Sequence, residues 1–341
     1  MKKHAIIPIF IPHKGCNNEC VFCNQRKITA RTNPLTPADI HKTVDDYMST
    51  LAHMDMDEIE LSFFGGSFTG IPMDEQKAFL EVAKEYKDQG IIQKIHLSTR
   101  PDYIDNNILT NLKAYDVDVI ELGVQSFSDT VLKASMRGHD AACVYESAAL
   151  IKEYGFTLGI QLMIGLPEDT YERDLFSARE TVKLSPSIAR LYPTVVIGDT
   201  KLQEMLTDGQ YAPLNQDEAV MRTAAMYRIL VDAGINVIRV GLKSSDLISD
   251  NSTNSGTFHP AFRQLVEGTI AREDLSAQLK LCNPNTSVCC ISNPDSFNNM
   301  VGHKAIYKKY FSTTFSDLKI RYCTDKSINK GVYSTLIEKE I

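Results

Sequence analysis

Alternation between strand-like and helix-like patterns over about the first 240 residues constrains the fold more than any other feature of the chain. Short apolar runs are each followed by a stretch of helical periodicity, which predicts parallel strands with helices outside them. The expected strands cover residues 5–11, 58–64, 94–99, 117–124, 156–164, 188–197 and 236–240, and the expected helices cover residues 37–52, 74–87, 105–115, 128–135, 141–154, 171–184 and 216–233. The pattern predicts an α/β fold, a partial or full TIM-like (β/α) barrel, with its chemistry at the carboxyl ends of the strands.

The pattern changes after Gly241. Residues 246–257 are rich in Ser, Asn, Asp and Gly, and we expect a loop there. Beyond that loop, the expected helices cover 261–272 and 305–311, the expected strands cover 278–282, 287–291 and 318–323, and the tail after Thr324 shows no pattern. The sequence therefore predicts two domains, a barrel of residues 1–245 and a small α+β extension of residues 246–341.

Composition places the 341-residue chain among soluble globular proteins, with 43% hydrophobic and 23% charged residues. The sequence has no apolar run long enough to cross a membrane, and its N-terminus lacks the pattern of a signal peptide. We expect a cytoplasmic protein whose eight cysteines are kept reduced.

Cys16, Cys20 and Cys23 form a C-x3-C-x2-C pattern directly after the first predicted strand. Three thiolates from so short a loop can hold three irons of a cubane cluster and leave the fourth iron for a small-molecule ligand. Zinc is an alternative, with His13 as a fourth ligand, although no second pair of ligands lies at the usual distance. Cysteines that only pack are a further alternative, and the spacing leaves all three interpretations open.

Glycine and polar residues follow several predicted strands. Gly65, Gly66 and Ser67 end the second strand, where glycines permit positive φ or a close backbone approach. Gln125 ends the fourth strand and Gln161 lies in the fifth, and a buried amide there needs either a neighbouring loop or a ligand. Arg137 follows soon after, as a surface arginine or as a clamp for a carboxylate.

These segments carry a resemblance. The cysteine motif with its aromatic Phe22, followed in order by Gly-Gly-Ser-Phe-Thr, Ser-Thr-Arg-Pro-Asp-Tyr, Gly-Val-Gln-Ser, Arg-Gly-His, Gly-Leu-Pro and Leu-Tyr-Pro-Thr-Val-Val-Ile, resembles the radical S-adenosylmethionine (SAM) superfamily. The series over residues 5–240 is similar to the radical SAM domain of the Elongator catalytic subunit group. It shares Gly-Val-Gln-Ser-Phe and Gly-Leu-Pro with oxygen-independent coproporphyrinogen oxidase.

The resemblance implies cofactors and residue roles. It implies a [4Fe–4S] cluster on Cys16, Cys20 and Cys23, with SAM on the unique iron and reductive cleavage of SAM to a 5′-deoxyadenosyl radical. The other roles it implies are Phe22 on the SAM side of the cluster, Gly65, Gly66 and Ser67 as the loop that meets the SAM amino group, Gln125 and Gln161 as ribose contacts, and Arg137 as the partner of the SAM carboxylate. Ser98 departs from the pattern, because relatives often have Glu there.

The resemblance also implies partners. An electron donor of the flavodoxin or ferredoxin type is expected, and a tRNA base is the first expected substrate, with a tetrapyrrole as the alternative. A zinc-bound module without catalysis is a further alternative. The Elongator subunit has an acetyltransferase domain after this region, and we expect none here, since the chain ends too soon.

Two further features bear on partners and metals. The net charge of −7 disfavours polyanion binding over the whole surface, but Arg26, Lys27 and Arg31 offer a basic patch or a solvated basic turn. A second metal site would draw on Cys282, Cys289, Cys290 and Cys323. Adjacent cysteines in a strand point to opposite faces, so buried structural cysteines are the favoured interpretation.

Overall fold

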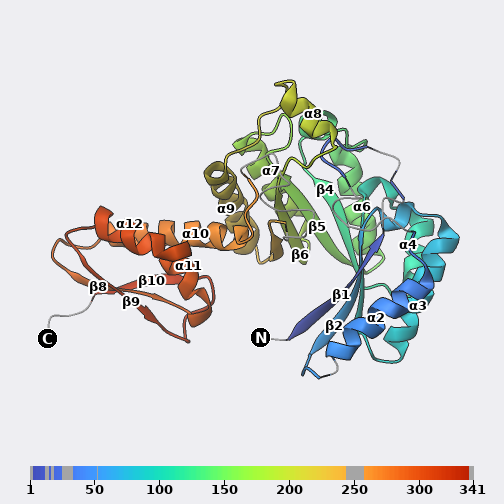
Figure 1. The fold of residues 1–341 in the computed structure, drawn as a ribbon, viewed down its shortest axis with the longest axis horizontal. Coiled ribbons are helices and arrows are strands. Elements are labelled where there is room, and N and C mark those ends of the chain that lie inside the picture. Colours follow the sequence, from blue (N-terminus) through green and yellow to red (C-terminus); the bar gives the residue numbers. More distant parts are fainter. Residues whose placement is uncertain are drawn as a thin grey trace. The chain divides into compact units, whose positions relative to one another are not determined.

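A computed structural model describes residues 3–11, 15–16, 19–24, 34–51, 53–242 and 257–337 (Figure 1). The predicted loop over 246–257 lies outside these residues except for Thr257, as do His13 and the basic patch of Arg26, Lys27 and Arg31. Contacts divide the chain into two compact units, Met1–Asn215 with Met226–Phe258, and Gln216–Ala225 with His259–Ile341. The domain boundary between residues 245 and 246 stays a prediction.

The first unit is built on a seven-stranded parallel sheet whose strands follow each other in sequence order. The strands are β1 (His4–Ile11), β2 (Glu58–Gly65), β3 (Lys94–Thr99), β4 (Val119–Gln125), β5 (Thr157–Ile164), β6 (Ile188–Pro193) and β7 (Asn236–Val240). The sheet curls into a half-barrel with helices on its convex side (Figure 1). The predicted α/β fold is confirmed in its partial-barrel form.

Helices cover the convex side because alternate strand residues are apolar and need burial. Leu61, Leu97, Leu122, Leu162 and Leu191 are all fully buried. The helices that follow the strands are α2 (Pro37–Leu51), α3 (Met73–Asp88), α4 (Asn106–Ala114), α5 (Asp129–Ala134), α6 (Ala141–Glu153) and α7 (Tyr171–Leu184). The short helix α8 (Lys201–Thr207) lies instead at the end of the half-barrel, where its Leu202 packs on Val21 (Figure 1). The last helix, α9 (Gln216–Asp232), belongs to this unit from Met226 onward.

Local chemistry explains several helix starts. Asp105, Asp140 and Thr170 precede α4, α6 and α7, and each accepts a hydrogen bond from a backbone N–H of the first turn. The strand predicted over 188–197 is too long, since β6 ends at Pro193 and the apolar residues after it are buried in irregular backbone. The error arises because a short, uninterrupted apolar run has no periodicity, so the sequence does not distinguish a buried strand from a buried loop.

The second unit packs helices on a three-stranded sheet (Figure 1). Its elements are α10 (Phe262–Leu279), α11 (Phe297–Val301), α12 (Ile306–Thr314), β8 (Ser287–Ser292), β9 (Lys319–Thr324) and β10 (Tyr333–Ile337). The central strand β8 pairs parallel with β9 and antiparallel with β10. Leu275, Val288 and Phe311 are fully buried in its core.

Two expectations about this unit are wrong. Residues 278–282 form no strand, because α10 continues to Leu279 and buries Leu275 and Leu279 four residues apart on one face. The tail contains β10, which the sequence did not signal because its order depends on pairing with β8.

The expectation that all eight cysteines are reduced is also wrong. A disulfide joins Cys289 of β8 to Cys323 of β9. Cys290 points to the opposite face of β8 and lies in the apolar core, so burial raises its pKa to about 12. With two sulfurs bonded to each other and Cys290 in apolar surroundings, these cysteines are not arranged as a second metal site.

Within the described residues, no helix is both long and apolar enough to span a bilayer.

Candidate active site

The cysteine loop leaves the carboxyl end of β1 and is held from two sides. Val21 donates its backbone N–H to Ser135 O over 3.2 Å, and its carbonyl accepts from Leu202 N over 2.7 Å. Cys23 N donates to Cys20 O over 3.0 Å, which closes a tight turn. These contacts fix Cys20, which is only 5% exposed, between the end of α5 and the start of α8.

Phe22 anchors this loop through its ring. It packs, partly buried, on an apolar cluster that includes Val21, Val196 and Leu202. The ring thus joins the cysteine loop to α8. Its predicted position on the SAM side of a cluster stays a prediction.

A close backbone contact joins the cysteine loop to the turn after β2. A Cβ added at Gly70 would lie 1.9 Å from Gly15 O, and one added at Gly15 would lie 2.3 Å from Ser67 O. Gly15 also has a φ of +78°, which favours glycine. Gly66 N donates to Ile11 O over 3.0 Å. The structure therefore brings the predicted glycine loop beside the predicted cysteine loop.

Gly65 begins this turn with a φ of +103°, so the backbone reverses there in a conformation that favours glycine. The turn continues into a short 3-10 helix at Phe68–Gly70.

Two arginines lie against the sulfur of Cys20. Arg137 Nη1 is 3.2 Å from Cys20 Sγ, and Arg100 Nη1 is 3.8 Å from the same atom. Arg137 also donates to Gly123 O, and Arg100 pairs with Asp102 over 2.8 Å. Two guanidinium groups thus direct N–H donors and positive charge at one buried sulfur. Arg137 was singled out from the sequence, whereas Arg100 was not, although it directly follows the third strand.

Gln125 and Arg137 keep buried polar atoms without partners. Gln125 has a φ of +71°, and a register shift after Gly123 pairs Gln125 with Leu162 of β5. Among the described residues, Gln125 Oε1 and Arg137 Nε have no hydrogen-bond partner. A Cβ at Gly123 would lie 3.1 Å from Gln125 Nε2 and 3.6 Å from Arg137 Nη2.

An unsatisfied buried polar group costs about 1–3 kcal/mol, so these atoms suit a polar ligand that supplies the missing hydrogen bonds. We name the set formed by the cysteine loop, the turn at 65–70, Gln125 and Arg137 the rim. Its three cysteines, the Arg137 guanidinium and the unpaired amide, with Arg100 beside them, fit an anionic iron–sulfur cluster with a polar chelating ligand.

Gln161 is placed differently from Gln125. Its amide nitrogen donates to Glu121 and, over 3.3 Å, to Ser98 Oγ. A ribose contact from Gln161 would therefore use its carbonyl oxygen. Ser98, the residue that departs from the family pattern, is one of its two partners.

A charged network crosses the middle of the half-barrel and was not predicted. His96 Nδ1 lies 2.8 Å from Glu60 Oε1, and His96 Nε2 lies 3.3 Å from Glu121 Oε2, an ion-pair distance without hydrogen-bond alignment. Arg190 Nε donates to Glu121 Oε2 over 2.8 Å, and its guanidinium lies 5.0 Å from the centre of the Phe64 ring. We name Glu60, His96, Glu121 and Arg190 the polar ladder.

The polar ladder shifts the pKa values of its members. Burial opposes the charge of His96, but the carboxylates of Glu121 and Glu60 outweigh it and raise the pKa of His96 to about 9. Burial likewise opposes the charge of Glu121, but Arg190 and His96 lower the pKa of Glu121 to about 2. The ladder is thus a balanced set of two cations and two anions at neutral pH.

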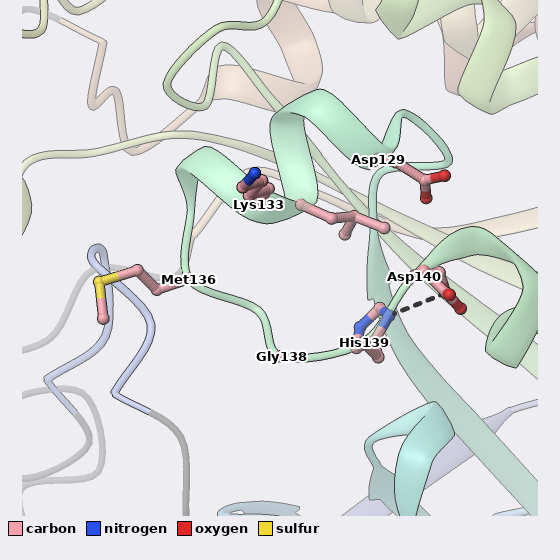
Figure 2. Close-up of a pocket in the computed structure, with 7 residues that line it drawn as sticks. Asp129, Lys133, Met136, Gly138, His139 and Asp140 are labelled. Carbon is pink, nitrogen blue, oxygen red and sulfur yellow. Dashed lines mark hydrogen bonds between the residues drawn. The ribbon is translucent and has the colours of Figure 1, made fainter.

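The loop that carries Arg137 also borders an open pocket. Figure 2 shows it lined by Asp129, Leu132, Lys133, Met136, Gly138, His139 and Asp140. Burial, and then the charge of Arg137, lower the pKa of His139 to about 4. His139 is therefore neutral at pH 7, and the positive charge of this loop near Cys20 belongs to Arg137.

Comparisons with known proteins agree with this geometry. Residues 10–177 match the family described as the radical SAM superfamily, and residues 186–272 match a radical SAM C-terminal domain. The chain is 26% identical over 287 residues to a tRNA uridine(34) acetyltransferase of Methanocaldococcus infernus, covering 69% of this chain and 53% of that protein. It is 28% identical over 255 residues to Elongator complex protein 3 of Dictyostelium discoideum, covering 66% and 45%. The chain spans about half the length of these curated relatives.

Solved structures share the fold. An archaeal Elp3 of Methanocaldococcus infernus, with an N-terminal deletion, aligns with a TM-score of 0.62 at 19% identity, covering 80% of this chain and 64% of that one. Methylornithine synthase aligns with a TM-score of 0.51 at 16% identity, covering 73% and 75%. At these identities the likeness shows the half-barrel alone. With both sequence matches in place, the chain belongs to the radical SAM superfamily of enzymes and is similar within it to Elongator complex protein 3.

Proposed function

We propose that this protein holds a [4Fe–4S] cluster on Cys16, Cys20 and Cys23, cleaves SAM reductively, and acts on a base of tRNA. The arginine pair over Cys20 is the observation that carries the proposal, because a buried sulfur that accepts from Arg137 and Arg100 is suited to be a thiolate ligand. When bound, the cluster and SAM supply one-electron cleavage to a 5′-deoxyadenosyl radical.

The residues of the rim would bind and orient SAM. Gln125 Oε1 is a buried acceptor that a hydroxyl can satisfy, and Arg137 Nε is a buried donor that a carboxylate can satisfy. Gly66 and Ser67 lie beside the cysteine loop, where their backbone can meet an amino group. Phe22 packs beside the same loop and would help exclude water there.

A tRNA base is favoured as the substrate by the relatives, which include tRNA uridine(34) acetyltransferases. The concave face of the half-barrel offers Phe64 and Arg190 in contact, a combination suited to a planar base. An electron donor of the flavodoxin or ferredoxin type would supply the electron.

The cluster is tested with Cys20→Ala and a matched control, Cys143→Ala. Burial raises the pKa of Cys143 to about 11, so its thiol stays protonated and is a poor ligand. After anaerobic reconstitution, we expect about four irons and four sulfides per chain in the wild type and in Cys143→Ala. Cys20→Ala should lose the cluster absorption and all 5′-deoxyadenosine formation with dithionite and SAM.

A full chromophore and normal SAM cleavage in Cys20→Ala would refute the proposal, and colourless wild-type protein with one zinc would favour a binding module. The substrate is tested separately by crosslinking to tRNA. Bound porphyrin without crosslinked tRNA would refute the tRNA assignment.

A further inference from the structure

The last strand of the half-barrel contains a bulge that changes which face an arginine occupies. Ala189 of β6 pairs with Val237 of β7, but the next residue, Arg190, pairs with Arg239, so Ile238 is an extra residue. A one-residue shift moves every following side chain to the other face of a strand. Without the bulge, Arg239 would pair with Leu191, which is buried on the convex side. With it, Arg239 lies beside Arg190 on the concave side.

The two neighbouring arginines differ in their partners. Arg190 is bonded to Glu121 and stacked against Phe64. Arg239 is half-buried, and within the described part of the chain it makes no hydrogen bond or ion pair. A partly desolvated guanidinium without a counter-ion is unfavourable, especially in a chain with 43 acidic residues that could have supplied one.

Tyr192 is the neighbour that would share a ligand with Arg239. Its hydroxyl lies 3.5 Å from Arg190 Nη1. Tyr192 follows Arg190 by two residues on β6, so its side chain lies on the same concave face, where Arg190 pairs with Arg239. Burial raises the pKa of Tyr192, and the charge of Arg190 acts against that rise. A neutral phenol beside an unpaired guanidinium offers one O–H donor and several N–H donors to an anion.

We propose that Arg239, with the Tyr192 hydroxyl, binds a phosphate of the nucleotide whose base is modified. The phosphate site rests on the proposed function, and it identifies Arg239 as a residue that determines substrate specificity. A guanidinium can bind two phosphate oxygens at once, whereas the charge of Arg190 is already compensated by Glu121. Phe64 and Arg239 flank Arg190 on the concave side, so the base and the phosphate would have separate contacts.

The test compares uridine 5′-monophosphate with uridine, using the reconstituted full-length protein and isothermal titration calorimetry at low ionic strength. We expect the wild type to bind the nucleotide about tenfold more tightly than the nucleoside, the size expected for charge-assisted hydrogen bonds. Arg239→Gln should abolish this preference, and Arg239→Lys should keep part of it. Arg179→Gln, on the exposed face of α7, is the matched control and should keep it fully.

A preference that survives in Arg239→Gln, or that is missing in the wild type, would overturn the proposal. A preference for orotate over uracil that depends on Arg239, with none for the nucleotide, would also overturn it in favour of a carboxylate. Cluster absorption and 5′-deoxyadenosine formation by the wild type are measured on the same preparation. Their loss would refute the radical SAM chemistry, whereas loss of the nucleotide preference alone would refute only the phosphate site.

Discussion

The rim and the polar ladder differ in how their buried charges are compensated, although both are built on one sheet. In the ladder each charge faces an opposite charge, as with His96 between Glu60 and Glu121, although His96 Nε2 and Arg190 Nη2 make no hydrogen bond among the described residues. At the rim Gln125 Oε1 and Arg137 Nε stay unpaired among the described residues. The difference is therefore one of charge balance: the ladder supplies its own counter-charges, whereas the rim places Arg137 beside Cys20 and leaves room for a ligand to supply hydrogen bonds.

The variant with the largest expected effect is Glu121→Gln, which tests whether the charges of the polar ladder stabilise the half-barrel. It keeps the shape of the side chain but leaves His96 and Arg190 without their shared carboxylate. We expect a loss of about 3–5 kcal/mol in the free energy of unfolding, because one partner of a buried charge network is removed. Urea denaturation measures it.

The control for that variant is Glu81→Gln on the exposed surface of α3, which should change the unfolding free energy by less than about 0.5 kcal/mol. Equal effects of the two variants would show that the ladder does not stabilise the half-barrel through its charges.

The pH dependence of stability sharpens the comparison next. The pKa of His96 is raised from 6.5 to about 9 on folding, so the stabilisation is complete below pH 6.5 and is lost as the pH rises through 9. The lowered pKa of Glu121, about 2 against 4.5, acts in the opposite direction: its contribution is present above pH 4.5 and is lost as the pH falls through 2.

We expect the wild type to lose about 3 kcal/mol of unfolding free energy between pH 6.5 and 9 from His96. His96→Gln should lack this decrease, since Gln does not titrate. Urea denaturation at both pH values gives the change in unfolding free energy for each protein. An equal change in the wild type and in His96→Gln would contradict a charged His96 in the folded protein.

The smallest expected effect on stability is at the rim. Gly70→Ala places a Cβ against the backbone of Gly15, which cannot move without shifting the cysteine loop. Overpacking of this kind costs about 1–3 kcal/mol, yet we expect it to disrupt iron and sulfide binding, measured after anaerobic reconstitution.

Gly90→Ala is the matched control for Gly70→Ala. Gly90 has a φ of +73°, so alanine is strained there, but an added Cβ meets no atom within 4 Å. It should lower stability by a similar amount and keep the cluster. Full cluster assembly in Gly70→Ala would show that the contact between the two loops is not needed for the metal site.

The features that the sequence predicts correctly depend on residues within one strand, one helix or one loop. The order of the seven strands, the half-barrel and the position of the cysteine loop after β1 follow from local periodicity and from the rule for parallel β-α units. The neighbouring positions of Gly66, Ser67 and the cysteine loop follow too, since carboxyl ends of parallel strands meet at one edge.

The polar ladder had a weaker signal. Its members Glu60, His96, Glu121 and Arg190 lie on the inward face of their strands, which alternation within each strand can suggest. Which of them meet across the sheet depends on the register between strands, and no single strand contains that information.

By itself, the sequence determined the class of fold and the chemistry available at the strand ends, because both depend on periodicity and on residues close together in the chain. Only the tertiary structure decided that Arg100 joins Arg137 at Cys20, that Gln161 is bonded to Glu121, and that a bulge places Arg239 beside Arg190. These contacts join residues 37 to 117 positions apart or depend on one extra residue in a strand. Their geometry is set by packing and strand register, which exist only after the chain has folded.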